Sequence, residues 1–133
     1  MYQNNSEQMD KIIPALIKAQ SMITGAVKDG RNPHYKSSYS TLESVINACK
    51  EPLNENELMF TQCVNIDEEK IILETKIYHS SGQWIASHCP LITTKNDAQG
   101  YGSSLSYFKR YTLASIMGIA QMDDDGTEAV KPE

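Results

Sequence analysis

The run GYGSSLSYFKRYTLASIMGIAQMDDDG, residues 100–126, is the longest patterned stretch of the chain. Apolar residues recur along it at spacings of three and four, which is typical of an amphipathic helix. In its middle, Lys109 and Arg110 stand between Tyr107 and Tyr111. We therefore predict a helix with one face packed in the core and the other face exposed as a candidate functional surface.

The predicted helix has two unlike faces when its residues are placed about 100° apart. The core face holds Tyr101, Leu105, Phe108, Thr112, Ile116 and Ile119. The other face holds Ser103, Tyr107, Arg110, Tyr111, Ala114 and Gly118. Arg110 between two tyrosines can combine charge with stacking, whereas Lys109 reaches out from the rim of the apolar stripe. A salt bridge of Arg110 at the surface or to another subunit is the alternative.

The residues before this helix, 57–92, alternate with a period of two instead. Polar turns at residues 67–70 and 80–82 divide them into three runs. Alternating runs joined by short turns predict an antiparallel β-meander with one covered face.

Two amphipathic helices are predicted before the meander, one over residues 6–28 and one from Ser40 onward. Pro14 should start or kink the first helix. Ser40 and Glu43 fit a capping box for the second, which Pro52 should bend or end. The order α-α-β-β-β-α predicts an α+β domain with its helices on one face of the sheet.

Composition predicts one domain over residues 1–121 and an acidic, flexible tail over residues 122–133. A hydrophobic content of 40% and a charged content of 22% are typical of soluble globular proteins. No apolar run approaches the roughly 20 residues of a membrane span, and the N-terminus does not resemble a signal peptide. The three dispersed cysteines are expected to be reduced thiols of a cytoplasmic protein without a membrane partner.

The charge of the chain is unevenly distributed around its net value of −5. Residues 11–50 hold six Lys or Arg against two Asp or Glu, and residues 77–121 hold three against one. Acidic segments separate and follow these two basic blocks. A site for a polyanion is therefore possible, but it would be local.

A second candidate site is the segment DGRNPHYKSSYS, residues 29–40, which has no apolar periodicity. We predict an ordered loop in which Arg31 and Lys36 alternate with aromatic residues that include Tyr39. Interleaved cations and rings suit single-stranded nucleic acid, because the cations follow phosphates and the rings stack on bases. Tyrosines that anchor the loop in the core are the alternative.

Signals of catalysis are weak throughout the chain. Asp123, Asp124 and Asp125 can bind a hard cation, but solvated or salt-bridged acids at a helix end are the alternative. His88 and Cys89 would point to opposite faces of a strand, which disfavours joint metal binding. No nucleophile motif is present, so we predict a protein that is not an enzyme and needs no cofactor, metal or small-molecule substrate.

Two long segments together resemble the Erf (essential recombination function) family of phage single-strand annealing proteins. The first is NPHYKSSYSTLESVINACKEPLNENEL, residues 32–58, and the second is GSSLSYFKRYTLASIMGIAQMDDDG, residues 102–126. The motif HSSGQWI, residues 79–85, fits between them. The resemblance covers roughly residues 10–128 in order.

The resemblance implies a mechanism of strand pairing. Proteins of this family bind single-stranded DNA and pair complementary strands without ATP, as oligomers in the form of rings or filaments. Their proposed fold is similar to the β-β-β-α core of the eukaryotic strand-annealing recombinases, in which a lysine–arginine pair on the helix after the meander contacts DNA. Lys109 and Arg110 occupy the matching place, and the cytoplasm of a bacterial host is implied.

The implied DNA-contacting residues, taken with those of the two basic segments, are Arg31, Lys36, Tyr39, Tyr107, Lys109, Arg110 and Tyr111. Two other functions remain open from the sequence. One is a metal-dependent enzyme on nucleic acid that uses the three aspartates, and the other is a protein-interaction module that does not bind DNA.

Overall fold

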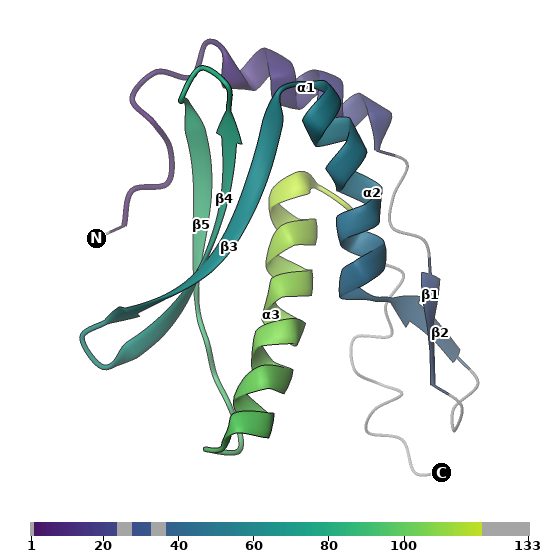
Figure 1. Cartoon of the computed structure of the whole chain (residues 1–133), viewed down its shortest axis with the longest axis vertical. Coiled ribbons are helices and arrows are strands. Elements are labelled where there is room, and N and C mark those ends of the chain that lie inside the picture. The colour runs from purple at the N-terminus through teal and green to yellow at the C-terminus, as the bar shows by residue number, and fades with distance from the viewer. Residues whose placement is uncertain (1, 24–27, 33–36, 121–133) are drawn as a thin grey trace.

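The computed structural model describes residues 2–23, 28–32 and 37–120, which form three helices and two small sheets (Figure 1). The helices are α1 (Ile12–Met22), α2 (Leu42–Glu55) and α3 (Ala98–Met117). The strands are β1 (Lys28–Asn32), β2 (Ser37–Ser40), β3 (Leu58–Asp67), β4 (Lys70–His79) and β5 (Trp84–Pro90). The predicted α+β order of two helices, a three-stranded meander and a final helix is confirmed.

The meander is regular and antiparallel, with β4 in the middle. β3 pairs with β4 from Leu58 opposite His79 to Asp67 opposite Lys70. β5 pairs with β4 from Trp84 opposite Tyr78 to Pro90 opposite Ile72. Because side chains alternate along a strand, one face of this sheet carries the residues that pack on the helices.

The core lies between that face and the three helices. In Figure 1, α3 and α2 lie beside one another and α1 crosses the end of the sheet. The fully enclosed side chains come from all three helices and the sheet: Ile12, Ala19, Val45, Cys49, Leu53, Ile77 and Leu113. Burial of such aliphatic side chains contributes about 1.5–3 kcal/mol each, so the helices are held mainly by this shared core.

The burial of α3 differs from the sequence prediction. Its buried residues are Leu113, Ala114 and Met117, and Ala114, predicted on the contact face, is only 1% exposed. The reason is that the C-terminal half of α3 packs against both α2 and the sheet, which enclose Ala114. The exposed surface of α3 is therefore concentrated in its N-terminal half.

The helix ends also differ from prediction in detail. α1 is shorter than predicted, and its first N–H groups, from Lys11 and Ile12, donate to the Gln83 side chain at 2.8 and 2.9 Å. The capping box of α2 is formed by Thr41 and Ser44, one residue later than predicted. Pro52 is buried inside α2 and does not end it.

The two ends of the segment predicted as an ordered loop are strands that pair with each other. β1 and β2 are antiparallel, with Arg31 opposite Ser38 and Gly30 opposite Tyr39. Residues 33–36 between the two strands lie outside the described residues. A two-stranded ribbon is held by backbone hydrogen bonds, which leave no apolar alternation in the sequence to reveal it.

The N-terminal segment adds a further contact to the meander. The Ser6 amide donates to the Trp84 carbonyl at 2.9 Å, and the Ala86 amide donates to the Asn4 carbonyl at 2.7 Å. These bonds and the bridge between Asn5 and Ile85 cover the outer edge of β5. Among the described residues, β3 is thus the strand of the meander with an unpaired edge.

The three free cysteines give a direct test of this burial pattern. Cys63 is exposed, whereas Cys49 is buried and desolvation raises the pKa of its thiol to about 11. Burial also raises the pKa of Cys89. Because the thiolate is the reactive form, iodoacetamide at neutral pH should alkylate Cys63 first and Cys49 last, as followed by mass spectrometry of timed samples.

The control is the same reaction in strong denaturant, where all three thiols should react at similar rates. Labelling of Cys49 as fast as Cys63 in the native protein would contradict the core described here.

Candidate nucleic-acid interface

Tyr107, Arg110 and Tyr111 form one cluster on α3, as their helical spacing predicts. The Tyr107 and Tyr111 ring centroids lie 4.6 Å apart, and Arg110 Cζ lies 5.8 and 4.8 Å from the two centroids. Tyr107 is 50% exposed, and Phe108 meets its ring edge-on at 5.3 Å. The cluster offers a cation and an accessible aromatic ring from one rigid element.

The backbone of α3 beneath this cluster is held by a polar contact to the sheet. The Gln62 amide nitrogen on β3 donates to the Lys109 carbonyl at 3.0 Å and to Thr75 Oγ1 at 3.0 Å. The Thr75 hydroxyl donates to Thr112 Oγ1 at 3.1 Å, and Thr112 donates to the Phe108 carbonyl at 2.6 Å. We call Gln62, Thr75 and Thr112 the polar node.

The polar node explains why polar side chains stand on an otherwise apolar face. Thr75 is fully buried, and a buried hydroxyl without a partner would cost about 1–3 kcal/mol. Hydrogen bonds are directional, so the node fixes how far α3 can slide or rotate on the sheet. Thr112 was predicted as a core position, and the structure gives that position this polar role.

The structure describes two of the three predicted site residues of the second basic segment. Arg31 lies in β1 and Tyr39 in β2, while Lys36 lies outside the described residues. In Figure 1, α2 stands between these two strands and α3. A DNA-binding role for the predicted residues of either segment stays a prediction.

Lys109 lies next to the cluster and is half-buried. Its carbonyl belongs to the contact with Gln62, so its backbone is anchored on the sheet side of α3. That Lys109 and Arg110 leave the helix in different directions stays a prediction.

A second cation–aromatic group, which the sequence prediction missed, lies on the sheet face away from the helices. Lys76 Nζ lies 3.9 Å from the Trp84 ring centroid and 4.9 Å from that of Tyr78. Tyr78 and Trp84 are register partners on β4 and β5. If the strand pairing had been extended outward from the two predicted turns, it would have placed these three residues together.

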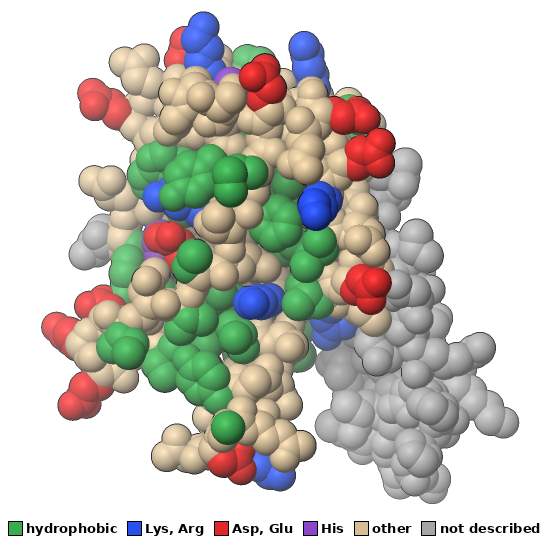
Figure 2. Space-filling view, in the orientation of Figure 1, with side chains coloured by type: hydrophobic (Ala, Val, Ile, Leu, Met, Phe, Trp, Pro, Cys, Tyr) green, Lys and Arg blue, Asp and Glu red, His purple; other side chains and the backbone are tan. Residues whose placement is uncertain are grey.

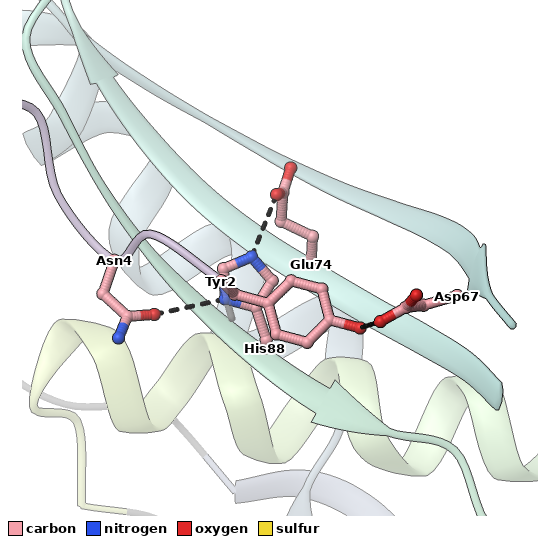
Figure 3. A network of polar contacts seen from close by, with 5 residues as sticks. All are labelled: Tyr2, Asn4, Asp67, Glu74 and His88. Carbon is pink, nitrogen blue, oxygen red and sulfur yellow. Dashed lines mark hydrogen bonds and ion pairs between the residues drawn. The ribbon is translucent and has the colours of Figure 1, made fainter.

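His88, considered with Cys89 as a metal pair, is instead held in a network of polar contacts (Figure 3). Its Nε2 lies 3.1 Å from Glu74 Oε2 and its Nδ1 lies 3.2 Å from Asn4 Oδ1. The Tyr2 ring stacks on the imidazole at 4.5 Å, and the Tyr2 hydroxyl donates to Asp67. That hydrogen bond raises the pKa of Tyr2.

The network in Figure 3 fastens the N-terminal segment across the outer face of the sheet. No group of three or more His, Cys, Asp or Glu side chains that could hold a metal ion occurs in the part of the chain that the structure describes. Asp123, Asp124 and Asp125 lie outside that part. Within the same residues, no helix is long and apolar enough to cross a membrane.

The chain belongs to the ERF superfamily, whose family model matches residues 12–133. The resemblance drawn from the two sequence motifs is thereby confirmed, and with it a general role of the recombination and strand-annealing type. No curated protein and no solved structure matches the chain.

The polar node gives a testable stability effect. Gln62→Ala should lower the free energy of unfolding by about 1–3 kcal/mol, because Thr75 and the Lys109 carbonyl lose a buried donor. Urea unfolding followed by circular dichroism measures the change. Asn65→Ala, an exposed position of β3 on the other face of the sheet, is the matched control and should stay within about 0.5 kcal/mol of wild type. Equal stability of the two variants would contradict the role of the node.

Proposed function

We propose that this protein binds single-stranded DNA and anneals complementary strands without ATP in phage homologous recombination, acting as an oligomer and not as an enzyme. The observation that carries the proposal is the cluster of Arg110 with Tyr107 and Tyr111 on α3 of an ERF-superfamily chain. Annealing needs a surface that holds the backbone while leaving bases available. A guanidinium for phosphates beside rings for bases has that chemistry.

Electrostatics favour an assembly over a single chain as the DNA-binding unit. The net charge of −5 repels a polyanion at long range, and the α3 cluster with Lys109 contributes only two cations. Repetition of the same helix in neighbouring copies would align these cations along one strand. The affinity gained from several linked contacts exceeds that of one contact without any new chemistry.

Two exposed apolar surfaces are suited to a contact between copies. One is the far end of the β3–β4 hairpin, where Ile66 is 77% exposed beside the acidic residues Glu68 and Glu69. Figure 2 shows hydrophobic and acidic side chains together at this lower-left end of the molecule. The other is the outer side of α1, where Ile17 is 64% exposed next to Lys18.

The two surfaces are complementary in both hydrophobicity and charge, and they lie far apart on one chain (Figure 1). A contact between the hairpin end of one copy and α1 of the next is heterologous. Such contacts generate rings when they close and helical filaments when they do not. We propose this contact as the basis of the oligomer.

DNA binding by α3 is tested by the double variant Lys109→Ala with Arg110→Ala. The slope of log K against log salt should become shallower by about 0.7 for each phosphate that the variant no longer neutralises. Fluorescence anisotropy of a labelled single-stranded oligonucleotide across a salt series measures the slope. Lys50→Ala with Lys70→Ala removes the same charge from exposed positions on α2 and β4 and is the matched control.

If both double variants change the slope equally, net charge and not the α3 cluster controls binding, and the site assignment is wrong. Unchanged binding by the α3 variant at moderate salt would exclude the assignment as well.

The proposed contact between copies is tested by the mass in solution, with and without a single-stranded oligonucleotide. Ile66→Ser should shift the protein to smaller species, because it removes the most exposed apolar side chain of the hairpin end. Asn65→Ser changes the adjacent residue, which points to the other sheet face, and should leave the mass unchanged. Light scattering after size exclusion reports the mass, and a monomeric wild type under both conditions would refute the oligomer.

A further inference from the structure

A pocket of about 560 Å³ opens beside the α3 cluster, between residues 92–95 and the first turns of α3. Its size lies within the range of about 300–1,000 Å³ typical of small-molecule sites. The side chains that matter for its chemistry are Ile92, Lys95, Gln99, Ser103, Tyr107 and Phe108. Apart from Tyr107, neither the predicted site nor the proposed function uses the residues of this pocket.

The walls of the pocket are fixed by local hydrogen bonds. Ser104 Oγ on α3 donates to the Ile92 carbonyl at 2.7 Å, and Asp97 accepts from the Gly100 amide at 2.7 Å as the N-cap of α3. A Cβ on Gly100 would lie 2.6 Å from the Lys95 carbonyl, so the segment packs directly on the helix backbone. The pocket is therefore formed before any ligand arrives.

The lining defines the chemical class of the ligand. Phe108 and Ile92, which is 69% exposed, supply apolar surface. The amide of Gln99 and the hydroxyl of Ser103 can donate and accept hydrogen bonds. Lys95 is the charged residue of the lining, and it is a cation. This combination suits a flat, uncharged ring with polar edges that is attached to an anion.

Tyr107 connects the pocket with the cluster, because it lines the pocket and its ring lies against that of Tyr111. Arg110 follows Tyr107 by three residues along α3, and its Cζ lies 5.8 Å from the Tyr107 ring centroid and 4.8 Å from that of Tyr111. A strand that places a phosphate at Arg110 would pass Tyr107 and reach the pocket next. The pocket is thus in continuity with the proposed DNA track.

We propose that this pocket receives one unstacked nucleobase of the bound single strand, with Tyr107 at its rim and Lys95 near the adjoining phosphate. The inference rests on the proposed function. It adds a site that binds a base to a surface that binds the phosphate backbone. A base held in this way would fix the register of the strand on each copy of the protein.

The test compares two probes, a labelled oligothymidylate and an oligonucleotide of the same length that consists of abasic sites. Ser103→Leu narrows the pocket with a good helix former that cannot stack on a base. Ser106→Leu makes the same change at an exposed position of α3 outside the lining and is the matched control. Circular dichroism confirms that both variants are folded.

Wild type should bind oligothymidylate more tightly than the abasic probe. Ser103→Leu should weaken oligothymidylate binding by about 5- to 150-fold, the equivalent of removing one base–aromatic stack, and leave the abasic probe unchanged. Ser106→Leu should match wild type with both probes. The pocket is then the site at which a base, and not a phosphate, is held.

Three results overturn the inference. If Ser103→Leu weakens the binding of both probes equally, the pocket contacts the sugar–phosphate backbone and not a base. If Ser103→Leu leaves the binding of both probes unchanged, the pocket holds no base. In both cases single-strand binding by wild type, and with it the proposed function, still stands. Failure of wild type to bind either probe instead overturns the proposed function together with the inference.

Discussion

The hydrogen bond from Gln62 to the Lys109 carbonyl is the contact on which the remaining geometry depends. It joins the edge strand of the meander to the middle of α3, and through Thr75 and Thr112 it reaches the central strand as well. The aliphatic core holds α3 on the sheet, but apolar contacts are not directional. The hydrogen bonds of the polar node are directional, so they fix how α3 is rotated on the sheet. Arg110, the residue after Lys109, therefore projects from the helix at a defined position.

Much of the fold could be predicted from periodicity. The change from a period of two to helical spacing located the meander and α3, because each period follows from backbone geometry. Contacts between segments that are distant in the sequence produce no such periodic pattern. The cap of α1 by Gln83, the edge pairing by Asn4 and the double-sided burial of Ala114 all depend on tertiary neighbours that a local pattern does not contain.

The candidate site also has one part that local sequence spacing predicts and another that depends on tertiary contacts. The grouping of Tyr107, Arg110 and Tyr111 follows from spacings of three and four on one helix, and it was predictable. The pocket beside Tyr107 requires the path of residues 92–95, and the Lys76–Trp84 contact requires the strand register. The result is an acidic chain with a local cationic and aromatic surface on α3.

The central claim is that the middle of α3, around Tyr107 and Arg110, is the surface that contacts single-stranded DNA. Photocross-linking of the protein to an oligonucleotide that carries 4-thiothymidine, followed by peptide mapping, tests it most directly. Cross-links are expected in α3 around Tyr107 and in residues 92–95. Cross-links confined to Trp84 and Tyr78, the aromatic group on the opposite sheet face, would contradict it.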